Sequence, residues 1–214
     1  MKIKWYGQAC FRITSENGTR IVTDPYHDML GYKLPELEAE IVTTSHEHGD
    51  HNNIGAVGGS FEHIKEAGSF LSAGIEIKGV ETFHDKVMGA KRGKNIVYQF
   101  KIDGLNICHC GDLGHLLDTG KVEEIGKVDI LLLPVGGRFT LNSEDAAEVM
   151  KQLNPKITIP MHYRTKALGK AGIIFEKAEK FVKIAKLNVL TEKELEVDRK
   201  NLDKKAGIVI LDYK

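Results

Sequence analysis

Residues 41–53 read IVTTSHEHGDHNN and place three histidines and an aspartate within six residues, directly after an apolar run typical of a buried strand. The four side chains are His46, His48, Asp50 and His51. Imidazole and carboxylate groups are costly to bury without partners, because each must find a hydrogen bond, a counter-charge or water. A metal ion accepts all four, so this stretch predicts a metal centre at the end of a strand.

The spacing within this cluster indicates two metal sites. His46 and His48 are two residues apart, so in extended backbone they point the same way and can share one ion. Asp50 and His51 are adjacent and point elsewhere, toward a second ion. The helical H-E-x-x-H zinc motif is excluded, since it needs a histidine at Asp50 and a helix where Gly49 follows a strand. Surface histidines without a metal are the simpler alternative.

The composition favours one globular domain, residues 1–214, with a sizeable core. Of the 214 residues, 42% are hydrophobic and 28% are charged, and 30 basic residues balance 30 acidic ones. A chain without net charge lacks the positive surface typical of a nucleic-acid-binding protein, so we expect a small-molecule substrate, and the oligomeric state is left open. No secretion signal and no apolar run of about eighteen residues occurs, which predicts a cytoplasmic protein outside the membrane.

Three cysteines, Cys10, Cys108 and Cys110, match neither a zinc ribbon nor a disulfide framework. They predict free thiols in a reducing compartment.

Strands that end in polar or glycine clusters recur along the chain. They are predicted within residues 19–26, 39–48, 74–85, 104–112, 127–137 and 156–163. Helices are predicted over residues 143–153, with Ser143 as the N-cap, and over residues 175–187, where Glu176 and Lys180 are paired one turn apart. The order of elements predicts two β-rich sheets covered by helices, with chemistry held at strand ends beside open loops.

Six short motifs carry a family resemblance. In chain order they are DPY (24–26), HEHGDH (46–51), FHD (83–85), CHCGDLGH (108–115), LLLPVGGRFTL (131–141) and IPMHY (159–163). With these motifs the sequence resembles the metallo-β-lactamase superfamily, in particular its small single-domain hydrolases, which include L-ascorbate-6-phosphate lactonases. The resemblance implies an α+β fold, a four-layer αββα sandwich, with a binuclear metal site at one edge of its two sheets.

Carried over by position, the resemblance also implies a ligand set. The ligands of one ion are His46, His48 and His84, those of the other are Asp50, His51 and His162, and the bridging ligand is Asp112. Asp24 would orient a histidine ligand from behind, and Asp50 would also transfer a proton as the catalytic residue. The implied cofactors are two divalent transition metal ions about 3.5 to 4 Å apart, zinc first, with manganese or iron as alternatives.

Residues near the motifs suggest contacts with an anionic substrate. Arg138, Tyr163 and Arg164 could bind it, and Gln8 stands in GQAC (7–10), where the family often has a histidine. The implied function is hydrolysis of an ester-type bond, in a phosphodiester, phosphoester or lactone, by a hydroxide that bridges the metals.

Two other functions remain open. One is a diiron redox protein, which would carry an acidic residue where this chain has His48. The other is a metal-binding module without catalysis.

Overall fold

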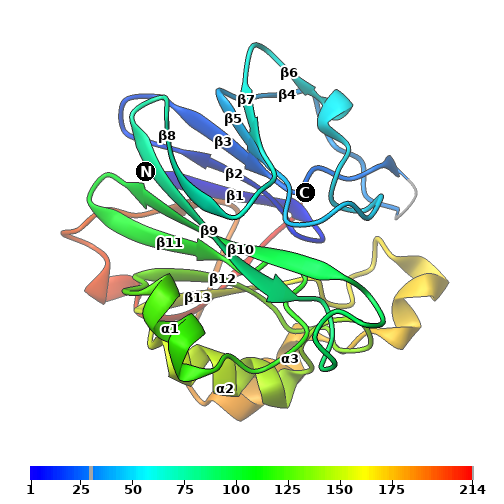
Figure 1. The fold of residues 1–214 in the computed structure, drawn as a ribbon. Coiled ribbons are helices and arrows are strands. Elements are labelled where there is room, and N and C mark those ends of the chain that lie inside the picture. The colour runs from blue at the N-terminus through cyan, green and yellow to red at the C-terminus, as the bar shows by residue number, and fades with distance from the viewer. Residues whose placement is uncertain (29–30, 214) are drawn as a thin grey trace.

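Runs of β-branched and aromatic residues build two mixed sheets in the structure, a computed structural model that describes residues 1–28 and 31–213. The sheets pack face to face, and the α-helices lie outside the larger sheet (Figure 1). The strands predicted from the sequence are confirmed as β3, β5, β9, β11, β12 and β13.

The smaller sheet has six strands in the order β15-β1-β2-β3-β5-β7. They are β15 (Leu195–Glu196), β1 (Lys2–Gly7), β2 (Cys10–Thr14), β3 (Arg20–Thr23), β5 (Ile41–Thr43) and β7 (Glu62–Ile64). Strands β1, β2 and β3 are antiparallel neighbours, whereas β3, β5 and β7 run parallel. Because β3 and β5 are parallel, the segments that follow them begin at the same edge of the sheet.

The larger sheet has eight strands in the order β14-β16-β13-β12-β11-β10-β9-β8. They are β14 (Val189–Glu192), β16 (Gly207–Leu211), β13 (Ile157–Met161), β12 (Ile130–Pro134), β11 (Leu105–His109), β10 (Lys94–Ile102), β9 (Ile75–Phe83) and β8 (Gly68–Ser72). Strands β11, β12 and β13 are parallel, and β10 is antiparallel to both β9 and β11. The carboxyl ends of β9, β11, β12 and β13 therefore share one edge.

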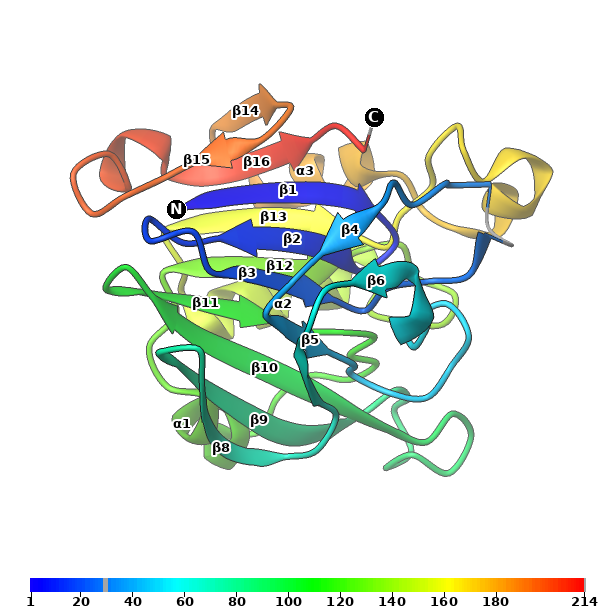
Figure 2. The ribbon, with the colours of Figure 1, turned by 90° about the horizontal axis from the view of Figure 1, so that it is seen from above.

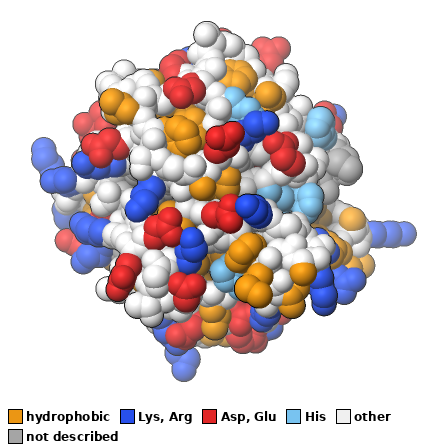
Figure 3. All heavy atoms as spheres, in the orientation of Figure 1, with side chains coloured by type: hydrophobic (Ala, Val, Ile, Leu, Met, Phe, Trp, Pro, Cys, Tyr) orange, Lys and Arg blue, Asp and Glu red, His pale blue; other side chains and the backbone are white. Residues whose placement is uncertain are grey.

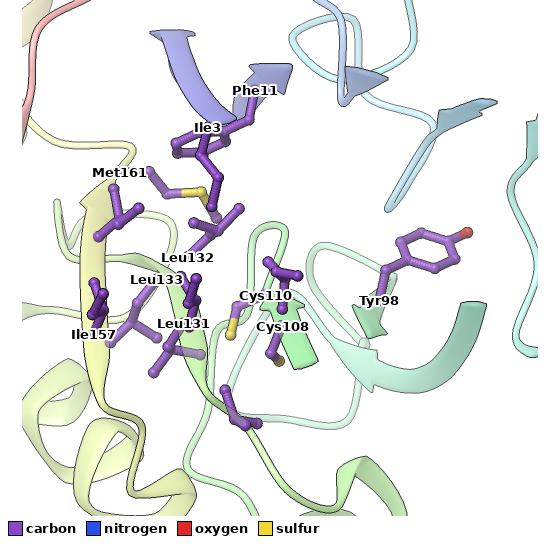
Figure 4. Packing of buried hydrophobic residues seen from close by; sticks show 14 of the residues in the cluster. Ile3, Phe11, Tyr98, Cys108, Cys110, Leu131, Leu132, Leu133, Ile157 and Met161 are labelled. Atoms are coloured by element: carbon purple, nitrogen blue, oxygen red, sulfur yellow. The ribbon is translucent and has the colours of Figure 1, made fainter. Parts of the chain in front are cut away.

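The main core lies between the two sheets. Ile3 and Phe11 of the smaller sheet point toward Leu132 and Met161 of the larger one (Figure 4), and all four are fully buried. Strand β12 is buried along its whole length, which explains its continuous apolar sequence, since helices cover its other face.

Helix α2 (Ser143–Leu153) has the predicted bounds. Its N-cap is Asn142 and not Ser143, because the Asn142 side chain accepts a hydrogen bond of 2.8 Å from the N–H of Asp145. The Ser143 hydroxyl, already inside the first turn, donates to Glu176 Oε2 at 2.7 Å instead.

The other helices depart more from the prediction. Helix α3 (Ala178–Ala185) is shorter than residues 175–187, although the predicted pair is present, with 2.6 Å between Lys180 Nζ and Glu176 Oε1. Helix α1 (Thr119–Ile125) was not predicted. It is short and mostly polar, and so gives little periodic signal.

The outer face of the smaller sheet is covered by irregular chain, by the short ladder of β4 (Leu37–Glu38) with β6 (Val57–Gly58), and by the 3-10 turn η2 (Ile54–Ala56) (Figure 2). A second apolar cluster lies beneath this cover, formed by Tyr6, Cys10, Val22, Tyr26, Tyr32, Leu37, Ala39, Val42, Val57 and Leu168. The four-layer α+β fold is confirmed, but within residues 1–28 and 31–213 this outer layer has no α-helix. No helix in the described part of the chain is both long and apolar enough to cross a membrane.

Candidate metal centre

Seven side chains with metal-binding chemistry meet at the edge where the parallel strands end. They are His46, His48, Asp50 and His51 after β5, His84 after β9, Asp112 after β11 and His162 after β13. The first four come from the smaller sheet and the last three from the larger one. Histidine side chains reach the surface on the face shown in Figure 3.

The first group consists of His46, His48 and His84, whose potential ligand atoms all lie within 4.8 Å of one another. His46 Nε2 faces His48 Nδ1 at 3.0 Å, and the His84 ring centroid is 4.9 Å from that of His46. Burial, aided by the positive charge of His51, lowers the pKa of His46 to about 3. His46 is therefore neutral at neutral pH, with a lone pair free for a metal ion.

The second group consists of Asp50, His51, Asp112 and His162, with the same limit of 4.8 Å. His51 Nε2 lies 3.3 Å from Asp112 Oδ1 and 3.6 Å from Asp50 Oδ2. His162 Nε2 lies 3.4 Å from Asp112 Oδ2 and 3.9 Å from Asp50 Oδ2. Burial favours a neutral Asp112, but the charges of His162 and His51 outweigh it and hold the pKa of Asp112 well below its usual value.

Asp112 lies between the two groups. Its Oδ2 is 3.1 Å from His84 Nε2 in the first group, while its Oδ1 faces His51 in the second. One carboxylate is thus within reach of both groups, and its role as a bridging ligand stays a prediction.

The residues present fit a pair of metal ions. Ligands held about 2.0 to 2.1 Å from a tetrahedral ion lie roughly 3.3 Å from each other. The contacts within the two groups range from 3.0 to 3.9 Å. His51 Nε2 and Asp112 Oδ1 are buried and have no hydrogen-bond partner among the described residues. Leaving both unsatisfied would cost several kcal/mol, about 1–3 for each group, and a shared cation removes that cost.

Asp24 orients histidines of both groups from behind. Its Oδ2 accepts a hydrogen bond of 2.8 Å from His51 Nδ1 and one of 2.6 Å from Ser45 Oγ. The Ser45 hydroxyl in turn lies 3.0 Å from His46 Nδ1. With Nδ1 engaged in this way, the Nε2 atoms of both rings face the centre, as metal-binding histidines require. The role of Ser45 was not predicted, because only the fold brings it to Asp24.

Gln8 lies beside the second group. Its Nε2 is 3.3 Å from His162 Nε2 and 3.5 Å from Asp50 Oδ2. The backbone carbonyl oxygen of Gln8 accepts hydrogen bonds from the backbone N–H of His162 and from the Trp5 indole N–H. These two bonds hold Gln8 at its unusual backbone φ of 47°. Gln8 is buried, and its Oε1 lacks a partner among the described residues, so it remains available to a ligand.

The three other predicted substrate contacts lie in different surroundings. Arg138 is exposed on the loop after β12. The Tyr163 ring packs against Trp5 with 5.1 Å between centroids and is buried. Arg164 lies with Tyr163 on a groove between α3 and β16, which is separate from the cleft beside His46. The role of each in substrate binding stays a prediction.

A cleft of about 610 Å³ opens beside His46 and His48. Charged side chains of both signs line it, including Glu47, Lys65 and Arg92. Glu47 is directed away from the metal-binding atoms, since its carboxylate accepts hydrogen bonds from Asn52 at 3.2 Å and from Lys65 at 3.4 Å. The volume is within the usual range for small-molecule sites.

Comparisons with known proteins agree with this geometry. Residues 2–162 match the model of the beta-lactamase superfamily domain. A UPF0173 metal-dependent hydrolase of Pelotomaculum thermopropionicum is 32% identical over 196 residues, covering 77% of this chain and 85% of that protein. The crystal structure of a candidate Zn-dependent hydrolase of the metallo-β-lactamase superfamily from Thermotoga maritima is 39% identical, with a TM-score of 0.82 over 98% of this chain and 97% of that one.

A more distant structure shares the fold alone. The diiron β-hydroxylase CmlA of Streptomyces venezuelae is 13% identical, with a TM-score of 0.65 over 98% of this chain and 52% of that one. The same scaffold thus supports other metal chemistry, and the function has to be argued from the site.

Proposed function

Because the chain belongs to the metallo-β-lactamase superfamily and, within it, to the UPF0173 metal-dependent hydrolase family, we propose that it hydrolyses an ester-type bond of a small anionic substrate with the help of two divalent metal ions. The bond is that of a phosphodiester, a phosphoester or a lactone. Zinc is the proposed metal, with manganese and iron as alternatives that histidine and carboxylate ligands also accept.

One observation carries this proposal. Two groups of histidine and aspartate ligands lie side by side, and the buried carboxylate of Asp112 faces both. These two groups of residues would hold a pair of ions, which would supply a hydroxide at neutral pH and stabilise negative charge on the attacked and leaving oxygens.

The chain's own residues contribute orientation and proton transfer. Asp24, directly and through Ser45, fixes the rings of His51 and His46. Asp50 is the most exposed carboxylate of its group, with 29% of its side chain accessible, so it can reach a bound substrate as well as its histidine neighbours. We assign to Asp50 the transfer of a proton to the leaving group. Gln8 can donate to, or accept from, a substrate atom next to Asp50.

The proposed substrate is a small molecule and not a nucleic acid, since the chain has no net charge. A lactone that carries a phosphate is one candidate. The three buried free cysteines fit a cytoplasmic location, where thiols stay reduced.

The diiron redox function is less well supported. It calls for an acidic ligand at the position of His48, and the neighbouring Glu47 is engaged with Asn52 and Lys65. A non-catalytic module would bind metal without turnover, and the position of Asp50 and Gln8 beside the second group would then serve ligand binding alone.

The test is a hydrolysis screen over phosphodiesters, phosphomonoesters, lactones and thioesters, with zinc, manganese or iron restored to chelated protein. We expect turnover of one class that disappears on chelation and returns with metal. Metal-loaded protein that hydrolyses none of them would refute the proposal, and oxygen consumption by the iron form would favour the diiron alternative.

A further inference from the structure

Two arginines share one aromatic ring at the rim of the metal centre. The guanidinium carbon of Arg92 lies 3.9 Å from the centroid of the Phe139 ring, and that of Arg138 lies 5.5 Å from the same centroid. Both distances are within the range of cation–π attraction. Because both are measured to the centroid of one ring, the two guanidinium carbons lie at most 9.4 Å apart.

The donors of these guanidinium groups are free for a ligand. Within residues 1–28 and 31–213, neither arginine side chain has a hydrogen bond or an ion pair with a carboxylate. The nearby cations differ, since Lys86 pairs with Asp145 at 2.5 Å and Lys94 with Glu81 at 2.8 Å. A guanidinium that stacks on a ring keeps its N–H edges exposed, and these edges match the oxygens of a phosphate or carboxylate.

The loop that carries Arg138 starts against His162, at Gly136. A side chain at Gly136 would bring its Cβ within 2.0 Å of the His162 carbonyl oxygen, so only glycine permits this close approach. Arg138 itself has a φ of 59°, a conformation that costs a residue with a side chain about 1 kcal/mol or more. The loop after β12 thus holds Arg138 at a set position relative to the second group, in spite of that cost.

Arg92 is fixed next to His84 in a comparable way. Asp85, which follows His84, accepts hydrogen bonds from four backbone N–H groups of its own loop, and one of them belongs to Arg92 at 2.8 Å. The carboxylate therefore holds the loop in one conformation. Arg92 also lines the cleft beside His46 and His48.

Aromatic contacts connect this pair of arginines to the metal centre. The Phe139 ring meets Phe175 edge to face at 5.9 Å, and Phe175 meets His162 in the same way at 5.5 Å. Both phenylalanines are half-buried, so they offer an apolar surface between the arginines and His162.

We infer that Arg92 and Arg138, stacked on Phe139, form a binding site for an oxyanion group of the substrate, a phosphate or a carboxylate, that lies one aromatic ring away from the bond to be cleaved. The assignment of this anion to the substrate rests on the proposed function, whereas the anion site itself does not. The substrate would carry an apolar portion between the oxyanion and the reacting group, in contact with Phe175.

The test uses the zinc-loaded full chain labelled with ¹⁵N and follows the Nε–Hε signals of its arginines by NMR. We expect the signals of Arg92 and Arg138 to shift together and to saturate when inorganic phosphate or acetate is added. The tighter of the two anions identifies the oxyanion. Arg199 is an internal control, because its Nε already donates to Gly104 O at 3.0 Å.

Arg92→Gln and Arg138→Gln should each weaken the binding about tenfold or more, since each removes charge-assisted hydrogen bonds. The matched control is Lys91→Gln, which removes one positive charge from the same loop at an exposed position and should stay within twofold. Phe139→Leu keeps an apolar side chain but removes the ring, and it should weaken binding as each arginine change does.

Arginine signals that move with neither anion, or an affinity that is equal in wild type and Arg92→Gln, would overturn the inference. Phosphate bound at the metals would instead move histidine signals and would persist in Arg92→Gln. A chain that binds the anion through both arginines but hydrolyses nothing keeps the inference and refutes the proposed function.

Discussion

Replacing Asp24 by asparagine should weaken metal binding, although Asp24 belongs to neither group of metal-binding side chains. The carboxylate is fully buried and accepts three hydrogen bonds, from Ser45 N at 2.7 Å, Ser45 Oγ at 2.6 Å and His51 Nδ1 at 2.8 Å. Asparagine keeps the shape but has one acceptor oxygen and one NH₂ donor. With either orientation of the amide, at least one N–H of these partners would face another donor.

The size of the effect follows from these contacts. A hydrogen bond to a charged group is worth about 1.5–3 kcal/mol, and losing the partner behind a histidine ligand commonly costs about 10- to 100-fold in metal affinity. The two figures agree, since 1.4 kcal/mol is about a factor of ten. We therefore expect zinc to bind Asp24→Asn about 10- to 100-fold more weakly than the wild type.

The assay is a competition titration against a chromogenic zinc chelator, with unfolding in urea measured separately by circular dichroism. Thr44→Val is the matched control, because it removes a hydroxyl from the same strand end that is 3.0 Å from His63 Nε2 and not from a metal-binding histidine. It should lose stability without losing zinc affinity. If Asp24→Asn bound zinc within twofold of wild type while still folded, the orienting role of Asp24 would be wrong.

Four further changes test the centre itself. Asp50→Asn should lower the turnover rate by about 10² to 10⁴-fold with little loss of bound metal, because the amide cannot accept a proton, whereas His84→Ala should lose metal and rate together. Steady-state kinetics combined with metal analysis measures both effects, and near-normal turnover by Asp50→Asn would contradict its role in proton transfer. Gly136→Ala should displace the segment around His162, since the new Cβ would lie 2.0 Å from the His162 carbonyl oxygen. The folded variant should then contain less zinc, and full zinc content would show that this close approach does not position His162. Chelation of the wild type should lower the thermal unfolding midpoint, because an ion at about 1,000 times its Kd stabilises the native state by about 4 kcal/mol, and an unchanged midpoint would speak against a built metal site.

Much of the fold follows from local sequence, because the strands of both sheets combine apolar runs with polar stops. Residues 46–51 also predict metal binding from local sequence, since side chains two residues apart on extended backbone face the same way. The N-cap of α2 was assigned one residue late, at Ser143, because both Asn142 and Ser143 are good capping residues and only the structure shows which side chain bonds the helix.

Other features are set by contacts between distant segments. Ser45 gains its role only when β3 and β5 pair, which brings Asp24 to the adjacent strand end. Arg92 reaches Phe139 across 47 positions of chain, and no local pattern distinguishes it from other surface arginines. The predicted start of α3 at Phe175 was wrong, since the helix begins at Ala178. Phe175 packs instead against the Phe139 ring, and Glu176 accepts a hydrogen bond from the Ser143 hydroxyl.

Each group of metal-binding side chains draws on both sheets, His46 with His84 in one and His51 with Asp112 in the other. A bound ion would therefore link the two sheets directly, at the edge where their parallel strands end. Such a metal site is complete only after the two sheets have docked, so metal should bind late in folding and slow unfolding more than it speeds folding. Native-state hydrogen exchange should then respond to metal most strongly along the seam between the sheets, and least at the outer strands β8 and β14.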